Sequence, residues 1–342
     1  MTVEIPIHDN FRDLTLVEYL GILWPERSHR ALMKLFASGQ VRSQGRPVGA
    51  RRRVGELTDL ALAGNLDGVP TIFPAGAESS SLSILHEDDR IVALSKPSGI
   101  PVVPDRSRAL ESVLGLLTRR ELEARVGKPP GEFLRYRIVH RIDRLTSGLV
   151  LVAKTADVER ALAEDFEHRR VKKEYLALLS GVVAPARFTV HCPVVPGRKG
   201  KMRAGSWPSP KEPPSSQEAL TEFDVLERFQ GMTFVRARPV TGRTHQIRVH
   251  AWAAGHPLSI DPLYGSKARG EKTPWVPGIE RLTLHASRYE LPESWDEPRS
   301  FECPLPEDFK AALEALRKLS DGGAEGIGSV STEKNDERLK DE

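Results

Sequence analysis

One short segment of the chain combines residue types that could perform chemistry. Residues 140–149 read H-R-I-D-R-L-T-S-G-L, so the carboxylate of Asp143 stands between the guanidinium groups of Arg141 and Arg144. Opposite charge nearby favours the ionised carboxylate, which can act as a nucleophile or as a general base. The commoner alternative, on charge pattern alone, is an aspartate in a surface salt bridge. Asp143 is therefore a candidate catalytic residue.

The elements around this segment predict how Asp143 is presented. Thr146, Ser147 and Gly148 indicate a tight loop, and the apolar residues 149–153 that follow predict a buried strand. A loop at the edge of a rigid sheet is a common location for reactive side chains. Further strands are expected over residues 91–94, 175–179 and 233–240, and helices over residues 157–170, with basic side chains at the end, and 244–254.

The segment around Asp143 resembles the signature of the RluA-type pseudouridine synthases, with Ile142 where these enzymes usually have Leu. Other motifs of that family recur along the chain in the expected order, and several ordered motifs make a chance match improbable. They are K-P-S-G at 96–99, K-E-Y-L-A at 173–177, T-G-R-T-H-Q-I-R-V-H at 241–250, G-H-P at 255–257, D-P-L-Y-G at 261–265 and L-H-A at 284–286. The resemblance covers residues 82–310 and departs at Ile260, where the family usually has Gly.

The resemblance implies an isomerase that converts specific uridines in structured RNA, first of all ribosomal RNA, into pseudouridine. It makes Asp143 the nucleophile, Arg248 its ion-pair partner and Tyr175 the residue that stacks on the target base. Tyr175 is also a candidate for the late proton removal at C5, and Arg141 for the residue that enters the RNA stack where the uridine leaves. The nucleophile attacks either the ribose C1′ or the uracil C6, and both routes stay open.

Each of these residues also has a structural interpretation. Without its neighbours, Tyr175 would be a core tyrosine of a strand, and Arg248 would be a surface arginine of a helix. Three further motif residues are interpreted as framework or phosphate contacts, namely Arg243, His245 and Gln246. Two histidines are interpreted as hydrogen-bonded structural residues, namely His140 and His250.

Positive charge is concentrated near the N-terminus. The formal net charge is only +3, because residues 321–342 carry seven acidic and three basic side chains, whereas residues 27–53 carry eight basic and no acidic ones. Such a run predicts a phosphate-binding surface, with a merely solvated basic face as the alternative, and charge alone does not distinguish RNA from DNA. The predicted RNA contacts are Arg27, Arg30, Lys34, Arg42 and Arg46, together with Arg141, Arg144 and Arg243.

The N-terminal region predicts a small domain of its own. Apolar spacing indicates a helix over residues 14–24, Ser28 is the expected cap of a second helix that ends at Gly39, and residues 40–48 predict a hairpin that turns at Gln44. Two small helices followed by a basic hairpin resemble the RNA-binding domain of ribosomal protein S-four of the small subunit. This resemblance covers residues 14–62, with Gln44 where Asn is usual.

The expected organisation is two folded domains with a linker and a tail. The sequence predicts a small basic α/β RNA-binding domain over residues 1–63, a linker over 64–81, a catalytic domain over 82–320 and a disordered charged tail over 321–342. For the catalytic domain the resemblance implies an α+β fold with a mixed, largely antiparallel sheet and a central cleft. Residues 197–217, rich in Gly, Pro, Ser and Lys, are expected to form a surface loop.

Composition narrows the classes of function. The two cysteines, Cys192 and Cys303, are far apart in the sequence, which predicts a reducing compartment, the cytoplasm, and no disulfide framework. No apolar run reaches about 18 residues, so no membrane span is expected. No H-E-x-x-H, Walker A or G-x-G-x-x-G motif occurs, so we expect no metal, nucleotide or dinucleotide cofactor. The expected partner is RNA, ribosomal RNA before transfer RNA, and the expected state is a monomer.

Two other classes of function are alternatives. A noncatalytic RNA-binding protein for ribosome assembly would use the basic N-terminal region, but a pure binder has no need of the set Asp143, Tyr175 and Arg248. A kinase catalytic loop needs Asp directly after Arg and Asn five residues beyond that Asp. Here Ile142 intervenes, Gly148 stands at that second position, and no Gly-rich loop exists. The enzyme interpretation is therefore preferred.

Overall fold

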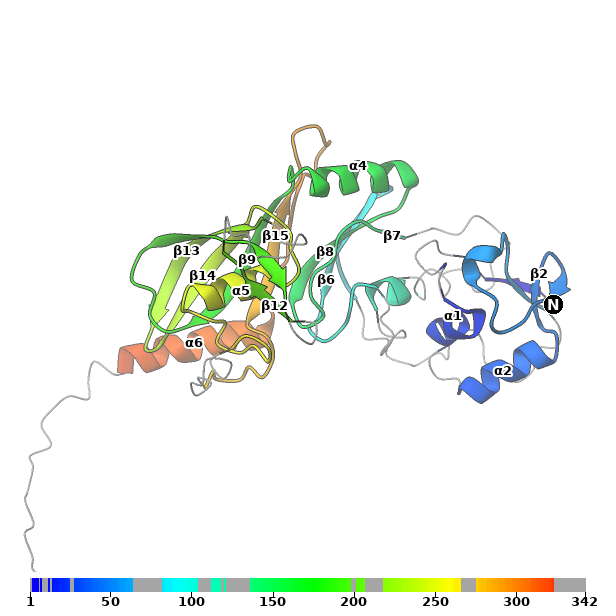
Figure 1. Ribbon diagram of the computed structural model, residues 1–342, viewed down its shortest axis with the longest axis horizontal. Coiled ribbons are helices and arrows are strands. Elements are labelled where there is room, and N and C mark those ends of the chain that lie inside the picture. The colour runs from blue at the N-terminus through cyan, green and yellow to red at the C-terminus, as the bar shows by residue number, and fades with distance from the viewer. Residues whose placement is uncertain are drawn as a thin grey trace, which may run out of the picture.

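The computed structural model describes residues 2–5, 7, 12, 14–24, 28–63, 82–103, 112–117, 120, 136–197, 201–206, 218–265 and 275–322. The predicted linker, Arg27, most of the loop 197–217 and the tail beyond residue 322 lie outside these ranges. Within them, no helix combines the length and the apolar character that a membrane crossing requires. Figure 1 shows the small N-terminal domain at one end of the molecule, with the larger domain beside it.

Two capped helices form part of the N-terminal domain. Helix α1 (Leu16–Leu23) begins with a capping box in which Thr15 and Glu18 exchange hydrogen bonds. Helix α2 (His29–Ala37) begins where the Ser28 hydroxyl accepts a hydrogen bond from an amide of the first turn, as predicted. The buried residues of the two helices include Leu16, Tyr19, Leu20, Leu32 and Leu35.

A four-stranded antiparallel sheet completes this domain in the order β1-β4-β2-β3. Its strands are β1 (Thr2–Glu4), β2 (Val41–Ser43), β3 (Arg46–Pro47) and β4 (Ala61–Ala63), and the short 3-10 helix η2 (Val54–Glu56) precedes β4. The predicted hairpin turns at Gln44 and Gly45, whose φ angles of 48° and 72° suit a tight two-residue turn. Strand β1, which the sequence did not predict, pairs Thr2 with Ala63.

A ten-stranded mixed sheet forms the centre of the larger domain (Figure 1). The strand order is β10-β13-β14-β9-β15-β8-β6-β5, with β16 paired to β15 and β7 paired to β8. Among the described strands, every pair is antiparallel except the parallel pair β15–β8. The α+β class with a largely antiparallel sheet is thus confirmed. The bounds are β5 (Ser83–Glu87), β6 (Ile91–Lys96), β7 (Arg137–Ile138), β8 (Ser147–Ala153), β9 (Lys172–Ser180), β10 (Arg187–His191), β13 (Leu220–Phe229), β14 (Met232–Pro239), β15 (Leu284–Glu290) and β16 (Ser300–Glu302).

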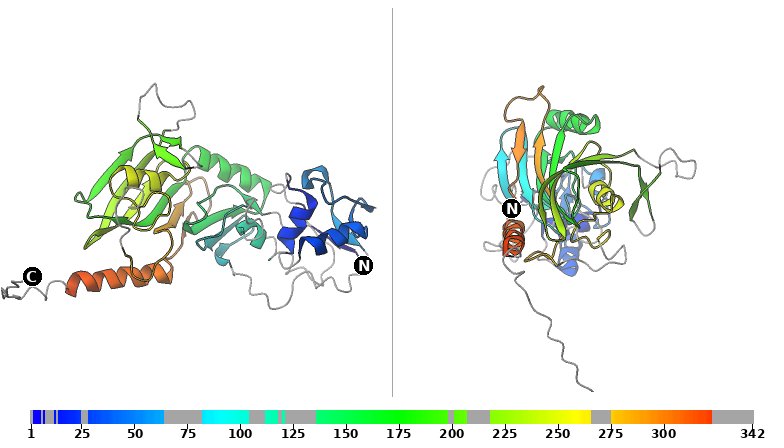
Figure 2. Two further views of the ribbon diagram at one scale, coloured as in Figure 1. Left: turned by 60° about the horizontal axis from the view of Figure 1, so that its bottom comes forward. Right: turned by 90° about the vertical axis from the view of Figure 1, so that its left-hand side faces the viewer.

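Helices α5 (Gln246–Ala253) and α6 (Glu307–Gly322) cover opposite faces of the sheet (Figure 2, right). The alternation along β9 gives the reason, because successive side chains of a strand point to opposite faces. Ala177 and Leu179 pack in the core that α5 closes, whereas Leu178 packs in the core that α6 closes. Helix α4 (Ala156–Glu167) packs against β8, and a short helical stretch spans residues 113–117. Helix α5 therefore lies on one face of the sheet, and α6 lies on the other.

Two local predictions were wrong, and one helix was not predicted. Helix α4 ends at Glu167, so the basic residues predicted for its last turn follow it, and Arg169 leaves the helical region with a φ of 61°. The predicted loop contains strand β12 (Met202–Ala204), which pairs with β11 (Val194–Pro196) as a hairpin. Helix α6 was not predicted and continues to Gly322, past the expected start of the tail.

Candidate active site

A turn before β8 presents Asp143. The Asp143 carbonyl accepts a hydrogen bond from the Thr146 amide at 3.0 Å, which closes the tight turn that the sequence predicts. The hydroxyl of Ser98, in the turn after β6, donates to the Leu145 carbonyl at 2.7 Å. Neighbouring strands therefore fix the backbone on which the Asp143 side chain stands.

Lys96, at the end of β6, forms a hydrogen bond to the backbone of the same turn. Its side chain is fully buried, and its ammonium donates to the carbonyls of Pro97, Ile100 and Arg144 at 2.9, 2.8 and 3.0 Å. Burial lowers the pKa of Lys96 to about 7, although the charge of Asp143 opposes this change. Three carbonyl contacts satisfy all three donors of the ammonium. Lys96 therefore joins the turn after β6 to the turn that carries Asp143.

Gly148 allows β8 to lie against β15 immediately after the Asp143 turn. Its φ of 116° lies in a region that L side chains rarely adopt. A Cβ atom at this position would stand 2.6 Å from the amide nitrogen of Ala286, and closer still to the carbonyl oxygen of that residue. Ala286 is also the parallel-pair partner of Gly148. A glycine is therefore required where the two strands meet.

Arg248, on α5, connects two carboxylates. Its Nε and Nη2 each donate to Asp261 at 2.8 Å, and its Nη1 donates to Asp143 at 3.1 Å. Burial alone lowers the pKa of Arg248, but hydrogen bonds and the charges of Asp261 and Asp143 outweigh it and raise that pKa. The Asp261 side chain is fully buried, whereas that of Asp143 is 22% exposed. Asp261 thus fixes the guanidinium, and Asp143 remains accessible.

Tyr175, on β9, lies in the same pocket. Its hydroxyl is 3.1 Å from the hydroxyl of Tyr289, which is fully buried. Burial raises the pKa of Tyr175 to about 12, and the nearby charge of Asp143 adds to the increase, while the hydrogen bond with Tyr289 opposes it. The phenolate is therefore scarce near neutral pH.

His140 forms an aromatic part of the pocket. Its ring stacks on Phe166 with centroids 4.4 Å apart and meets Tyr289 edge-on at 5.1 Å. Its Nε2 accepts a hydrogen bond from the Leu151 amide at 2.9 Å, and burial lowers the pKa of His140 to about 3. His250 is likewise hydrogen-bonded, to the Thr221 hydroxyl and the Cys192 carbonyl. The prediction that both histidines are hydrogen-bonded is confirmed, and their structural role stays a prediction.

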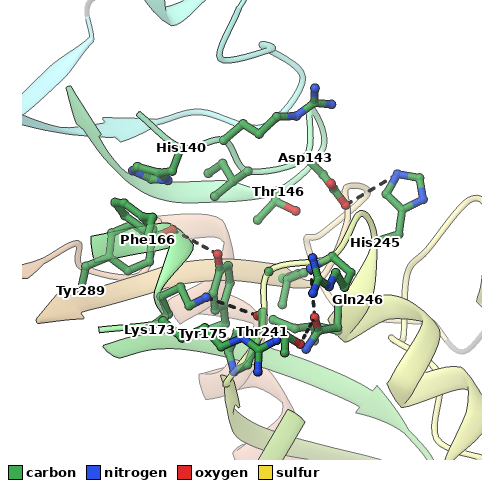
Figure 3. A pocket seen from close by; sticks show the side chains of 18 of the residues that line it. His140, Asp143, Thr146, Phe166, Lys173, Tyr175, Thr241, His245, Gln246 and Tyr289 are labelled. Atoms are coloured by element: carbon green, nitrogen blue, oxygen red, sulfur yellow. Dashed lines mark hydrogen bonds and ion pairs between the residues drawn. The ribbon is translucent and has the colours of Figure 1, made fainter. Parts of the chain in front are cut away.

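These side chains line one cavity of about 640 Å³, a size that accommodates a nucleotide. Figure 3 shows Asp143 and His245 together at one end, and His140, Phe166 and Tyr289 gathered at the other. Cations dominate the lining, which includes Arg141, Arg169, Lys173, Arg243 and Arg248 against the acids Asp143 and Glu167. A cavity with this balance of charge attracts a polyanion such as RNA.

The predicted RNA contacts divide between the cavity and the N-terminal domain. Arg141 and Arg243 line the cavity, whereas Arg144 does not, because its Nε donates to the Gly99 carbonyl at 3.0 Å. Among the described residues, the ion-pair partner of Asp143 is Arg248, with the His245 ring 3.8 Å away, and not the two arginines that flank Asp143 in sequence. Four predicted contacts are exposed on the N-terminal domain, namely Arg30, Lys34, Arg42 and Arg46.

Known proteins match this chain over most of its length. Residues 90–253 match the family model of RNA pseudouridylate synthases. Ribosomal large subunit pseudouridine synthase C of Yersinia pestis is 36% identical over 270 residues, which are 78% of this chain and 76% of that protein. Ribosomal large subunit pseudouridine synthase D of Nitrosomonas europaea is 33% identical over 330 residues, 93% and 89% of the two chains. The chain belongs to the RNA pseudouridine synthase family.

A solved structure agrees with this membership. Human RNA Pseudouridylate Synthase Domain Containing 4 superposes with a TM-score of 0.55 at 27% sequence identity, covering 69% of this chain and 93% of that one. The predicted family, enzyme class and fold are thus confirmed for this pseudouridine synthase.

Sequence reasoning missed three residues of this pseudouridine synthase's pocket region. Lys96 and Asp261 were part of the quoted motifs but were given no role, and His245 was interpreted as a framework or phosphate contact. An acid followed by Pro, at the start of the motif 261–265, was the available signal for Asp261, because a carboxylate there caps the turn amides of Leu263 and Tyr264.

The framework interpretation of Gln246 is confirmed. Its amide group accepts from the Thr241 hydroxyl and the Arg243 amide and donates to the Leu220 carbonyl and the Thr221 hydroxyl. Every donor and acceptor role of the side chain is thereby used in holding the start of α5. Ile260, the departure from the family pattern, packs among the residues that α6 covers.

Proposed function

We propose that this pseudouridine synthase isomerises uridine in the RNA of the large ribosomal subunit, with Asp143 as the nucleophile. The observation that carries the proposal is the meeting of Asp143, Arg248 and Tyr175 in one basic cavity. The names of the relatives, ribosomal large subunit pseudouridine synthases C and D, support ribosomal RNA as the substrate. Transfer RNA is the second candidate.

The reaction requires a nucleophile and a place for an unstacked base. The bond from uracil N1 to ribose C1′ breaks, the base turns, and a bond from C5 to C1′ forms, while C5 loses a proton and N1 gains one. Atoms and electrons balance without an oxidant. Asp143 attacks C1′ or C6 as a carboxylate whose charge Arg248 faces at 3.1 Å. The ring of Tyr175 stacks on the base, which offsets part of the cost of unstacking.

Basic residues position the RNA around this reaction. We propose that Arg141 enters the stack where the uridine leaves and that Arg243, at the cavity wall, contacts a phosphate. Arg144 supports the catalytic turn through the Gly99 carbonyl, so its contribution to RNA binding is indirect. The exposed arginines and lysine of the N-terminal domain bind phosphates farther from the reacting base, and we propose that Arg27 binds RNA as well.

The test is direct measurement of pseudouridine. The purified full-length enzyme is incubated with transcripts of large-subunit ribosomal RNA, small-subunit ribosomal RNA and transfer RNA, and pseudouridine is mapped chemically in each. We expect modification of the large-subunit transcript that disappears with Asp143→Asn. Modification of transfer RNA alone would make transfer RNA the substrate. Activity of Asp143→Asn equal to that of the wild type would show that Asp143 is not the nucleophile.

We propose further that the enzyme acts as a monomer in the cytoplasm. Cys192 and Cys303 are both free thiols, as in a reducing compartment. Light scattering at the concentration used for the assay should give the mass of one chain. A dimeric mass would contradict the monomer.

A further inference from the structure

His245 occupies an unusual position beside the nucleophile. It precedes α5 with a φ of 57°, a left-handed conformation that is uncommon for residues other than Gly, although His adopts it more often than most. Its side chain does not cap the helix. Instead the imidazole points to Asp143, with Nε2 3.8 Å from Oδ2, the same oxygen that accepts from Arg248 (Figure 3). The backbone conformation therefore serves to aim this ring.

Tyr264 contacts the ring nitrogen of His245 that does not face Asp143. The Tyr264 hydroxyl is 2.8 Å from the Met202 amide nitrogen and 2.8 Å from His245 Nδ1. The amide can only donate, so the hydroxyl oxygen accepts that bond. Of these two neighbours, only Nδ1 can accept the proton of the hydroxyl. When the hydroxyl hydrogen is used within these two contacts, Nδ1 is the acceptor, and the hydrogen of the neutral ring lies on Nε2, which faces Asp143.

The surroundings favour the neutral form of this imidazole. Burial lowers the pKa of His245, and although Asp143 opposes the decrease, the nearby positive charge of Arg248 adds to it. The guanidinium of Arg248 also lies over the Tyr264 ring, 5.0 Å from its centroid. The site thus already holds one cation between its carboxylates, and a second cation would be poorly accommodated.

We propose that His245 is a positioning residue for Asp143, whose Nε2–H orients the carboxylate during attack and whose tautomer is fixed by Tyr264. The inference rests on the proposed role of Asp143 as nucleophile. At 3.8 Å the contact is longer than a hydrogen bond, and such contacts commonly shorten when substrate fills a site. Arg248 and His245 then hold one carboxylate oxygen from two directions, which leaves the other free to attack.

Two substitutions separate this role from a structural one. The amide nitrogen of glutamine reaches the position of Nε2, whereas that of asparagine corresponds to Nδ1. Asparagine tolerates the left-handed backbone better than glutamine, so a purely structural role predicts that His245→Asn is the more active and more stable variant. Positioning predicts the opposite order of activity. Single-turnover rates, RNA affinity and melting temperature are measured for both full-length variants.

We expect His245→Gln to retain the wild-type rate within about tenfold, and His245→Asn to lose about a hundredfold, the scale of a misplaced reacting group. RNA affinity should be unchanged in both. In the unmodified enzyme, NMR of the ring nitrogens should show hydrogen on Nε2 of His245, and Tyr264→Phe should produce a mixture of tautomers. Hydrogen on Nδ1 in the wild type, or an asparagine variant as active as the glutamine variant, overturns the proposal.

A parallel measurement on Asp143→Asn separates two kinds of failure. If that variant still converts uridine, the nucleophile is misassigned, and the role of His245 falls with it. If Asp143→Asn is inactive while the two His245 variants are equally active, the proposed function stands and only the positioning role of His245 is wrong.

Discussion

At the scale of single residues, Arg248 is shared by two carboxylates in different surroundings. Asp261 is fully buried and accepts hydrogen bonds from two nitrogens of Arg248. The planar guanidinium therefore has a fixed direction. The remaining nitrogen faces Asp143, which is partly exposed to the cavity. Asp261 therefore fixes the guanidinium in place, and the positive charge of that guanidinium stabilises the ionised carboxylate of Asp143.

The first prediction concerns Asp143. Asp143→Asn keeps the size of the side chain but removes the negative charge that the proposed attack needs. Formation of pseudouridine should vanish, because an amide is a poor nucleophile. Binding of RNA, measured by filter retention, should largely persist, since the cavity cations remain. Substantial turnover by this variant contradicts the assignment.

The second prediction concerns Arg248. Arg248→Ala leaves the buried Asp261 without its partner, and loss of one member of a buried pair costs about 3–5 kcal/mol. We expect a lower midpoint of urea unfolding together with a severe loss of activity. Arg248→Lys should restore only part of both, because an ammonium lacks the planar fork. Arg187→Ala serves as a matched control, since that side chain is 83% exposed. Normal kinetics of Arg248→Ala would limit Arg248 to its structural contact with Asp261.

At the scale of elements, the local parts of the fold were predictable and the long-range parts were not. The Ser28 cap and the Gln44 turn depend on residues close in sequence, so their signals are read directly. The parallel contact of β8 with β15 depends on chain segments far apart, and no local pattern specifies it. Helix α6 was missed too, although the sheet face that it covers requires an apolar partner.

The same division holds for the candidate site. Asp143, Tyr175 and Arg248 were found because the motifs that contain them resemble a family. The partnership of Arg248 with Asp261 was not foreseen, because it is formed by tertiary contact and both residues have a plausible local interpretation. For His245, the direction of the ring depends on the positive φ angle of the backbone, and no pattern of residues in the sequence predicts that angle.

The third prediction concerns the junction of β8 and β15. Gly148→Ala places a Cβ against the backbone of Ala286 in a conformation that alanine disfavours. Because backbone cannot move aside as a side chain can, the turn that carries Asp143 must shift. We expect a decrease in stability of about 1–3 kcal/mol and a fall in the single-turnover rate. Gly231→Ala is a suitable control, because that glycine also has a positive φ but no atom near its missing Cβ. Equal rates for the two variants would show that the close approach is unimportant.

At the scale of the whole molecule, substrate binding and chemistry are assigned to different parts of the chain. The candidate catalytic residues lie in the larger domain, and the exposed cations Arg30, Lys34, Arg42 and Arg46 lie in the N-terminal domain. Figure 1 shows this domain beside the β6 end of the large sheet. The N-terminal domain thus extends the surface available to a long RNA without adding to the cavity.

The fourth prediction removes this domain. A shortened chain that begins at residue 82 should fold and keep the chemistry of Asp143 but bind RNA more weakly. Each lost phosphate contact should reduce the slope of log affinity against log salt by roughly 0.7 on single-stranded RNA. The loss should appear mainly in KM, because the domain contributes positioning. The two chains are compared in RNA titrations at several salt concentrations. Identical slopes and affinities would leave the N-terminal cations as a solvated face.

The long-range contacts that assemble the cavity also determine when it can exist. Asp143 and Arg248 are 105 residues apart, and Ser147, just after the catalytic turn, bonds to His285, 138 residues further on. No fragment that ends before β15 therefore contains the complete site, and loop closure over such separations is slow compared with helix formation. A growing polypeptide has no isomerase activity until β15 has been synthesised and placed. During refolding, activity should return after the helical signal, so catalysis reports the completed sheet.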